Sequence, residues 1–316
     1  MEMELNTQAV TGPVRAAATL VMLRDAPGGL EVFLIKRHGL SDVLGGAFVF
    51  PGGKVDHGDA EIDMQAHLDQ PPQLLHDLLG EPELDPLAAA GLYVTVMREA
   101  FEETGVLYAS GADTPVAIRA TQLLREGRAF DEVIATMALR LQASELTPWS
   151  RWITPRVPSH QQKRFDTRFF VAAVPPGQQA THDNHEATES VWLEPRDALQ
   201  QYWDRAIQLA PPQIMSLAHL SRHRSVASVL AEAKSRRPPL IQPEPVDHDG
   251  MRVLCYPGDA GHSVRDRALP GPTRLQYREH RFEPVDGFAS LFSQEIKQEM
   301  PEPDYNSKSS RLASGL

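Results

Sequence analysis

Three carboxylates follow one another closely in the segment Arg98-Glu99-Ala100-Phe101-Glu102-Glu103-Thr104-Gly105. In an α-helix, Glu102 would lie about 60° to one side of Glu99 and Glu103 about 40° to the other, so the three share one face. Like charges at this spacing repel each other by roughly a few tenths of a kcal/mol per pair. A hard divalent cation such as Mg²⁺ or Mn²⁺, which takes oxygen ligands, would offset that repulsion. The pattern therefore predicts a metal site, with Arg98 in reach of Glu102 to orient it.

The alternative is an ordinary solvated helix face, because pairs of acidic residues are common on helices. The surrounding sequence favours the metal site. The segment Phe50-Pro51-Gly52-Gly53-Lys54-Val55-Asp56 lies upstream, and its glycines allow the backbone to approach a ligand or a metal ion closely.

A single helix should carry the three carboxylates. Asp85 can cap it, Pro86 suits its first position and Gly105 suits the position after its end, which predicts a helix over 86–104. Because this helix also needs an apolar face, its other side should be buried in the core. That face consists of Ala90, Val94, Met97 and Phe101.

Alternating and helical patterns predict the remaining elements, which fall on both sides of this helix. Strands are predicted over 14–24, 30–36, 47–50, 168–174, 190–193, 252–256 and 273–277. Helices are predicted over about 115–142 and 196–209. The polar stretch 57–84 contains one short helical segment around 74–79, and the chain becomes proline-rich and extended from 236.

These residues together resemble the Nudix box, G-x5-E-x7-R-E-U-x-E-E-x-G-U. Gly53, Asp59 and the segment 98–106 occupy its positions, with Asp59 instead of Glu as the first acid and Ala100 at the aliphatic position. In this chain 38 residues separate Asp59 from Arg98 where the motif has 7, so 31 additional residues split the box.

The resemblance implies an α+β protein with the Nudix fold, an α/β/α sandwich around a mixed central β-sheet. It also implies hydrolysis of a nucleoside diphosphate linked to another group, in which water attacks phosphorus while Mg²⁺ or Mn²⁺ neutralises the bridging and leaving oxygens. Arg98 would orient the box glutamates, Asp59 would be a weaker acid, and either Glu102 or Glu103 would activate the water. The metal ligands implied by position are Glu99, Glu102, Glu103 and the carbonyl of Gly53.

A box that is split in this way is a feature of the peroxisomal coenzyme A diphosphatase type and its bacterial relatives. Segments 45–53 and 164–170 and the pair Pro211-Pro212 resemble that subgroup as well. The subgroup has the pattern L-L-x-x-R-[SA]-x3-R-x3-G-x3-F-P-G-G. Arg37 matches its first arginine, but Asp42 replaces the second. Since an acid cannot pair with phosphate as arginine does, this weakens the coenzyme A interpretation. ADP-ribose and NADH remain alternative substrates.

Several further residues are candidates for the site. Glu189 precedes a predicted strand and could supply an extra catalytic acid from a late loop, as Nudix folds often do. His182, His185 and Glu186 resemble a metal cluster, but no helical pattern surrounds them and we interpret them as a polar loop. The candidates for substrate binding are Arg37, Gly52, Gly53, Arg164 and Arg168, and each arginine could equally be a surface cation.

Composition excludes several classes of protein. The 316 residues carry 31 Lys and Arg against 42 Asp and Glu, a net charge of −11, which argues against a nucleic-acid partner. No apolar run approaches the ~20 residues of a membrane helix. A single cysteine fits a reducing, cytoplasmic setting. The expected partner is a small nucleotide-diphosphate substrate, and a homodimer is compatible with these features.

The sequence divides into three parts. We expect a Nudix hydrolase domain over 12–235, a proline-rich extension with short strands over 236–300 and a disordered tail over 301–316. The insertion within the box, at about 60–84, should lie beside the active site and shape the acyl or pantetheine end of a substrate. A Nudix module that binds a nucleotide without cleaving it is the alternative from another class, and the three retained glutamates favour the enzyme.

Overall fold

The computed structural model describes residues 9–10, 12–39, 45–157, 163–183, 187–248 and 251–293. Asp42, His185, Glu186 and the tail at 301–316 lie outside these residues. None of the helices in the described ranges is long and apolar enough to cross a membrane.

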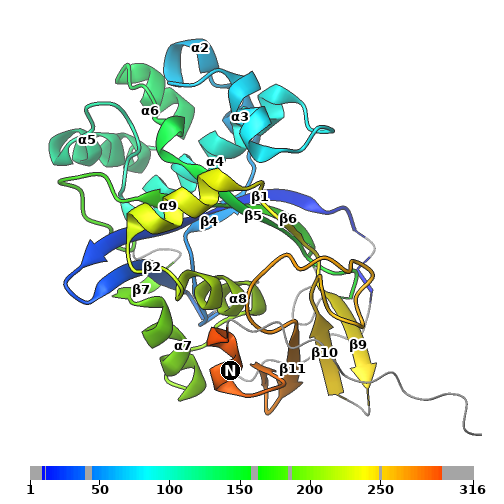
Figure 1. Cartoon of the computed structure of the whole chain (residues 1–316). Helices are drawn as coiled ribbons and strands as arrows, with labels where there is room; N and C mark the ends of the chain where they lie inside the picture. Colours follow the sequence, from blue (N-terminus) through cyan, green and yellow to red (C-terminus); the bar gives the residue numbers. More distant parts are fainter. Residues whose placement is uncertain are drawn as a thin grey trace, which may run out of the picture.

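A mixed eight-stranded sheet forms the centre of the molecule (Figure 1). Its order is β3-β2-β1-β6-β5-β8, with β4 paired to β1 and β7 paired to β2. The β1–β6 and β5–β8 pairs are parallel, and the others are antiparallel. The strands are β1 (Arg15–Ala26), β2 (Gly29–Arg37), β3 (Phe48–Val49), β4 (Gly52–Lys54), β5 (Thr147–Ile153), β6 (Phe165–Ala173), β7 (Ala187–Leu193) and β8 (Leu240–Ile241).

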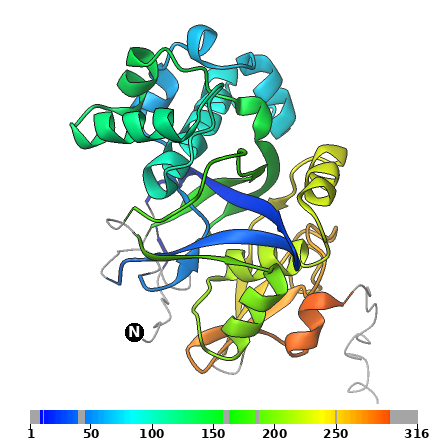
Figure 2. The same cartoon turned by 90° about the vertical axis from the view of Figure 1, so that its left-hand side faces the viewer.

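Helices cover both faces of this sheet, as Figures 1 and 2 show. One face carries α1 (His57–Glu61), α2 (Met64–His67), α3 (Pro72–Leu79), α4 (Pro86–Thr104), α5 (Thr114–Arg125) and α6 (Phe130–Thr136). The other carries α7 (Pro195–Trp203), α8 (Pro211–Leu220) and α9 (Val226–Ser235). Side chains of β1 alternate between the two resulting cores, with Leu20 and Met22 in one and Val21 and Leu23 in the other. The predicted α/β/α arrangement is confirmed.

Helix α4 has the predicted bounds. The carboxylate of Asp85 accepts hydrogen bonds from the backbone N–H groups of Leu87 (2.8 Å) and Ala88 (3.3 Å). The helix ends at Gly105, whose φ of 74° is the left-handed conformation that glycine adopts without a steric penalty. The predicted apolar face is fully buried. Local capping chemistry therefore determines where the helix with the carboxylates begins and ends.

The segment 57–84 differs from the prediction of a polar stretch with one helical segment. It forms α1, α2 and α3, and five of its side chains join the core against α4. These helices are too short to show a clear period in the sequence. The buried residues are Ile62, Met64, Leu68, Leu75 and Leu79. The single helix predicted over 115–142 is also two helices, α5 and α6, with Gly127 at φ 88° between them.

A second sheet follows α9, and its strands are antiparallel in the order β12-β11-β10-β9. They are β9 (Glu244–His248), β10 (Met251–Cys255), β11 (Arg274–Arg278) and β12 (Arg281–Pro284), and a 3₁₀ turn, η2, follows at Phe288–Phe292. Leu254, Leu275 and Phe282 belong to the same core cluster as Trp152 of β5. The hydroxyl of Tyr202 in α7 donates to the carbonyl of Phe282 at 2.7 Å. The C-terminal segment therefore shares a core with the α7–α9 face of the central sheet.

A cluster of polar side chains joins α8 to α9. His219 and His223 each place Nε2 on the Glu232 carboxylate, at 2.8 and 3.0 Å, and the Nε of Arg236 donates to it at 2.9 Å. The ligand atoms of His219, His223 and Glu232 lie within 4.8 Å of one another, a spacing that a metal ion could use. Because Arg236 already neutralises the carboxylate, we interpret the cluster as structural.

Acid should weaken this cluster, and the His219→Gln variant tests that expectation. Burial lowers the pKa of His219 below its usual value, so the unfolded chain binds more protons near pH 6.5 and stability is lost as the pH falls through this range. The hydrogen bond from His219 lowers the pKa of Glu232 to about 2, so its contribution is lost only in stronger acid. Urea unfolding at pH 7.5, 6.5 and 5.5 should show a smaller loss of stability for His219→Gln than for the wild type. His57→Gln, at a side chain that is 90% exposed, is the control. Equal pH slopes for His219→Gln and the wild type would contradict the interpretation.

Candidate active site

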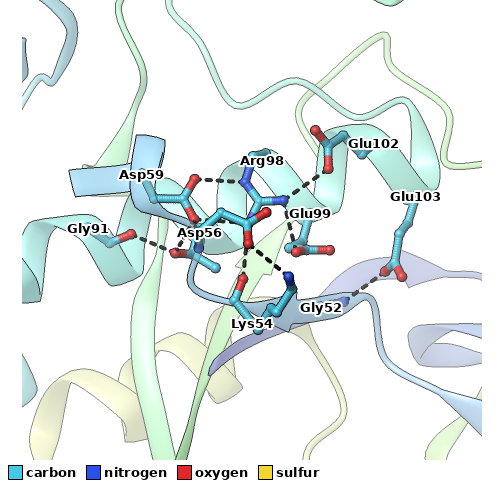
Figure 3. A network of polar contacts seen from close by, with 10 residues as sticks. Gly52, Lys54, Asp56, Asp59, Gly91, Arg98, Glu99, Glu102 and Glu103 are labelled. Atoms are coloured by element: carbon cyan, nitrogen blue, oxygen red, sulfur yellow. Dashed lines mark hydrogen bonds and ion pairs between the residues drawn. The ribbon is translucent and has the colours of Figure 1, made fainter. Parts of the chain in front are cut away.

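A cavity of about 720 Å³ opens where the C-terminal half of α4 meets β4. This volume is in the usual range for sites that bind small molecules. Both halves of the split box contribute to the wall, and their side chains converge on one region (Figure 3). The box residues that line it are Gly52, Gly53, Lys54, Asp56, Arg98, Glu99 and Glu102.

Arg98 lies at the centre of these residues. Its guanidinium donates two hydrogen bonds to Asp59, at 2.7 and 2.9 Å, and one each to Glu99 (2.9 Å) and Glu102 (3.0 Å). It also donates to the backbone carbonyl of Lys54 at 3.1 Å. Burial by itself would lower the pKa of Arg98, but the hydrogen bond with Asp59 and the surrounding negative charges outweigh it and raise the pKa. Arg98 therefore holds the carboxylates in place as a permanent cation.

Asp59 holds Arg98 in turn, although it comes from a different helix. Its carboxylate also accepts from the hydroxyl of Thr95 (2.8 Å) and from the backbone N–H of Asp56 (2.9 Å), and the residue is only 2% exposed. Asp59 is the third residue of α1, from which its side chain turns back to the start of the helix. The shorter acid found here in place of glutamate thus still reaches the arginine.

The two glycines of β4 are required by close packing. A Cβ on Gly53 would collide with the carboxylate of Glu99, and one on Gly52 would collide with the backbone of Ala18 in β1. The N–H of Gly52 donates to Glu103 at 2.8 Å. Glu99 therefore packs directly on β4, which we call the glycine strand. Glu103, which is 3% exposed, joins this strand to α4 through its hydrogen bond.

The box itself contains more acids than bases. Five carboxylates surround two cations, Arg98 and Lys54, and the acids are Asp56, Asp59, Glu99, Glu102 and Glu103. The pKa of Glu102 is raised because burial and the charges of Asp59 and Asp56 outweigh the attraction of Arg98. The acids of the box thus outnumber its two cations, and oxygen donors of this kind are the ligands that a hard divalent cation prefers. The donor set fits Mg²⁺ or Mn²⁺.

Only one of the three arginines proposed for substrate binding reaches the cavity. Arg37 lines it, and its buried Nε has no hydrogen-bond partner among the described residues. Arg164 donates to the backbone carbonyls at 154 and 155, at 3.0 and 3.1 Å. Arg168 pairs with Glu81 and Asp166 and lines a second cavity of about 350 Å³.

Two basic residues that the sequence did not single out line the cavity instead, Arg15 and Lys163. Arg15 starts β1 and alternates with Ala17 and Thr19, which also line the cavity. These three residues share one face of β1, whereas Ala18 and Leu20 on the other face belong to the core that contains α4. Lys163 lies in the connection before β6, where no periodic pattern marks it.

Glu189, the proposed extra catalytic acid, does not belong to the cavity wall. It lies on β7 opposite Lys36, pairs with that lysine at 3.3 Å and is 55% exposed. The nearby His182 places Nδ1 on the hydroxyl of Ser190 at 3.0 Å, as a polar loop residue would. The geometry therefore gives Glu189 no catalytic role.

The expectation that the insertion shapes the substrate site is wrong for residues 60–84. None of these residues lines the cavity at the box. Their apolar side chains pack against α4, and the stretch from Leu79 to Leu84 lines the second cavity, where Glu81 pairs with Arg151 (2.8 Å) and Arg168 (2.5 Å). The insertion is buried against the side of α4 that faces the core because its helices carry apolar residues that need a partner.

Residues 14–220, more than half of the chain, match a family model described as the NUDT19 Nudix domain. The chain belongs to the Nudix family. It is a hydrolase that acts on pyrophosphate bonds, and its substrates are small nucleotide derivatives. The resemblance of the split box to this family is confirmed.

Relatives and a solved structure agree with this assignment. The acyl-coenzyme A diphosphatase NUDT19 of Xenopus laevis is 26% identical over 271 residues, which cover 72% of this chain and 70% of that protein. A putative nudix hydrolase 7 of Caenorhabditis elegans is 24% identical over 274 residues, which cover 84% of this chain and 80% of that protein. The crystal structure of a NUDIX hydrolase from Alicyclobacillus acidocaldarius superposes with a TM-score of 0.59 at 29% identity, covering 72% of this chain and 98% of that one.

Removing the charge of Asp59 should impair both stability and activity. The Asp59→Asn variant leaves buried Arg98 without its bidentate carboxylate, so we expect a loss of about 3 kcal/mol in the free energy of unfolding. We also expect kcat/KM to fall roughly 10- to 100-fold, because Glu99 and Glu102 lose the support of a fixed arginine. Urea unfolding and steady-state kinetics measure the two effects. Asp63→Asn is the matched control, since exposed Asp63 caps α2 without touching Arg98. Wild-type activity in Asp59→Asn would refute the role assigned to this residue.

Proposed function

We propose that this Nudix hydrolase cleaves coenzyme A or acyl-coenzyme A, in a reaction that depends on Mg²⁺ or Mn²⁺, to 3′,5′-ADP and a phosphopantetheine product. The observation that carries the proposal is the group of box carboxylates held against the glycine strand at a cavity of 720 Å³. Support for the substrate comes from the relatives named acyl-coenzyme A diphosphatase and from the retention of Arg37 in the cavity wall.

The metal ligands we propose are Glu99, Glu102, Glu103 and the carbonyl of Gly53. A bound divalent ion would neutralise the negative charge that develops on the phosphoryl oxygens. Among these residues, Glu102 lines the cavity while Glu103 is fastened to Gly52, so Glu102 is the better candidate for the base that accepts a proton from the attacking water.

The remaining groups bind and orient the substrate. Arg98 holds Glu99 and Glu102 through hydrogen bonds, so they need not reorganise when the anion enters. Arg37, Arg15 and Lys163 add positive charge to the cavity wall and suit the phosphate groups of the substrate. A cytoplasmic location and a homodimer stay predictions from the sequence.

Product analysis over a small panel tests the choice of substrate. Coenzyme A, an acyl-coenzyme A, ADP-ribose and NADH are each incubated with Mg²⁺ and with Mn²⁺, and the products are separated by chromatography. We expect 3′,5′-ADP from the first two substrates at a kcat/KM at least about tenfold above that for the others. A preference for ADP-ribose or NADH would show that the alternative substrate class is correct.

Neutral variants of the box glutamates test the metal site. Glu99→Gln and Glu102→Gln should each lower kcat by about 10²- to 10⁴-fold, because either a metal ligand or the base is lost. Titration calorimetry should show weaker Mn²⁺ binding for both variants. Glu132→Gln, at an exposed position of helix α6, is the control. Undiminished turnover by Glu102→Gln, or Mn²⁺ binding that neither variant weakens, would count decisively against the site.

A further inference from the structure

The cavity continues beyond the Nudix box toward the second sheet. Pro243 and Leu254 line it, although both lie after residue 220, where the match to the family model ends. Both are buried. The C-terminal segment therefore supplies part of the wall of the active-site cavity.

An apolar wall connects the box to this segment. Thr19 of β1 pairs with Gly52 of β4 on one side and with Phe169 of β6 on the other, so the apolar region begins two strands from the box. Phe169 has its ring centroid 6.3 Å from that of Phe50 and 6.0 Å from that of Trp152. Trp152 in turn pairs with the end of β8, just before Pro243. These aromatic side chains suit an uncharged part of a ligand.

One positive charge of the cavity lies elsewhere along the same strands. Arg15 pairs with Phe165 four residues before the Thr19–Phe169 pair, which is roughly 13 Å along the strands. Arg15 is thus separated along β1 and β6 from the apolar wall around Phe169. A substrate with a charged half and an uncharged half, joined by a diphosphate, fits this separation.

Gln213 is a buried polar group in the wall of the same cavity. It lines the cavity at 6% exposure, and its carboxamide oxygen has no hydrogen-bond partner among the described residues. The helix that carries it begins with Pro211 and Pro212, which have no N–H, so the start of α8 lacks two of the donors with which helix N-termini usually bind anions. A carboxamide offers both donors and an acceptor, and its natural partner in an uncharged ligand is a secondary amide.

We propose that the region between Gln213 and Leu254 binds the non-nucleotide arm of the substrate, an apolar chain that carries secondary amides, as the pantetheine arm does. The C-terminal sheet then takes part in substrate choice, which we had expected of the insertion. The inference rests on the proposed function for the identity of the arm, and binding of the separate halves of the substrate tests it independently of turnover.

Calorimetry on the full chain measures the binding of 4′-phosphopantetheine and of 3′,5′-ADP to the wild type and to two variants. Gln213→Leu should weaken phosphopantetheine binding about tenfold, and Leu254→Ala about fivefold, while 3′,5′-ADP binding stays within about twofold of wild type. The matched controls are Gln200→Leu, at an exposed position of α7, and Leu275→Ala, the cross-strand partner of Leu254 outside the cavity. Neither control should alter binding of either half.

The outcomes separate this inference from the proposed function. Loss of 3′,5′-ADP binding in Gln213→Leu would show that the nucleotide occupies this region and would overturn the inference. Absent or unchanged phosphopantetheine binding in the variants would also overturn it, even if coenzyme A is cleaved. If the wild type binds phosphopantetheine through Gln213 but does not cleave coenzyme A, the proposed function fails and the inference stands.

Discussion

The buried ion pair between Arg98 and Asp59 is the interaction on which the site depends. Removing both charges from water is costly, and the attraction compensates only when the geometry is good and the remaining hydrogen-bonding groups are satisfied. Here the arginine donates two hydrogen bonds to the carboxylate. The hydroxyl of Thr95 and the N–H of Asp56 also donate to the same carboxylate. The pair joins two halves of the box that the sequence separates by 38 residues. The pair therefore holds the two halves of the box together across the insertion.

The same arginine explains how the neighbouring acids tolerate one another. Its third nitrogen reaches Glu99 and Glu102, while Glu103 turns to the backbone of Gly52. The three box glutamates, which share one helix face, thus have three different environments. This separation leaves Glu99 and Glu102 facing the cavity and uses Glu103 to fix the glycine strand against the helix.

Local chemistry made some parts of this molecule predictable. The bounds of α4 follow from an N-cap, a proline and a glycine within the helix itself, and its apolar face follows from the helical period. The short helices α1–α3 have no such period, and β5 contains Pro148 and two tryptophans that the sequence analysis had not assigned to a strand. Their structure depends on tertiary contacts with α4 and β6 that no local pattern records.

The alternation of side chains along β6 explains why Arg168, one of the three candidate arginines, lies outside the wall of the active-site cavity. In β6, Phe165, Thr167 and Phe169 line the active-site cavity, so Arg168 must point to the other face, where Glu81 neutralises it. A shift of one residue moves a side chain across the sheet, and the sequence does not show which face of β6 carries the cavity. Along β1, Ala18 and Leu20 belong to the core that contains α4, whereas Arg15, Ala17 and Thr19 line the cavity on the other face.

The insertion and the C-terminal sheet pack against different parts of the Nudix domain, and their roles differ for that reason. The insertion buries its apolar residues against α4 and so supports the helix from the core side, away from the substrate. The C-terminal sheet shares a core with α7, α8 and β5, which places Leu254 and Pro243 in the wall of the cavity. Because these two residues follow the part of the chain that matches the family model, the segment that contains them is in a position to distinguish substrates that share the same diphosphate. In this arrangement, bond cleavage depends on the box residues of α4 and the glycine strand, whereas the choice of substrate depends on the C-terminal segment.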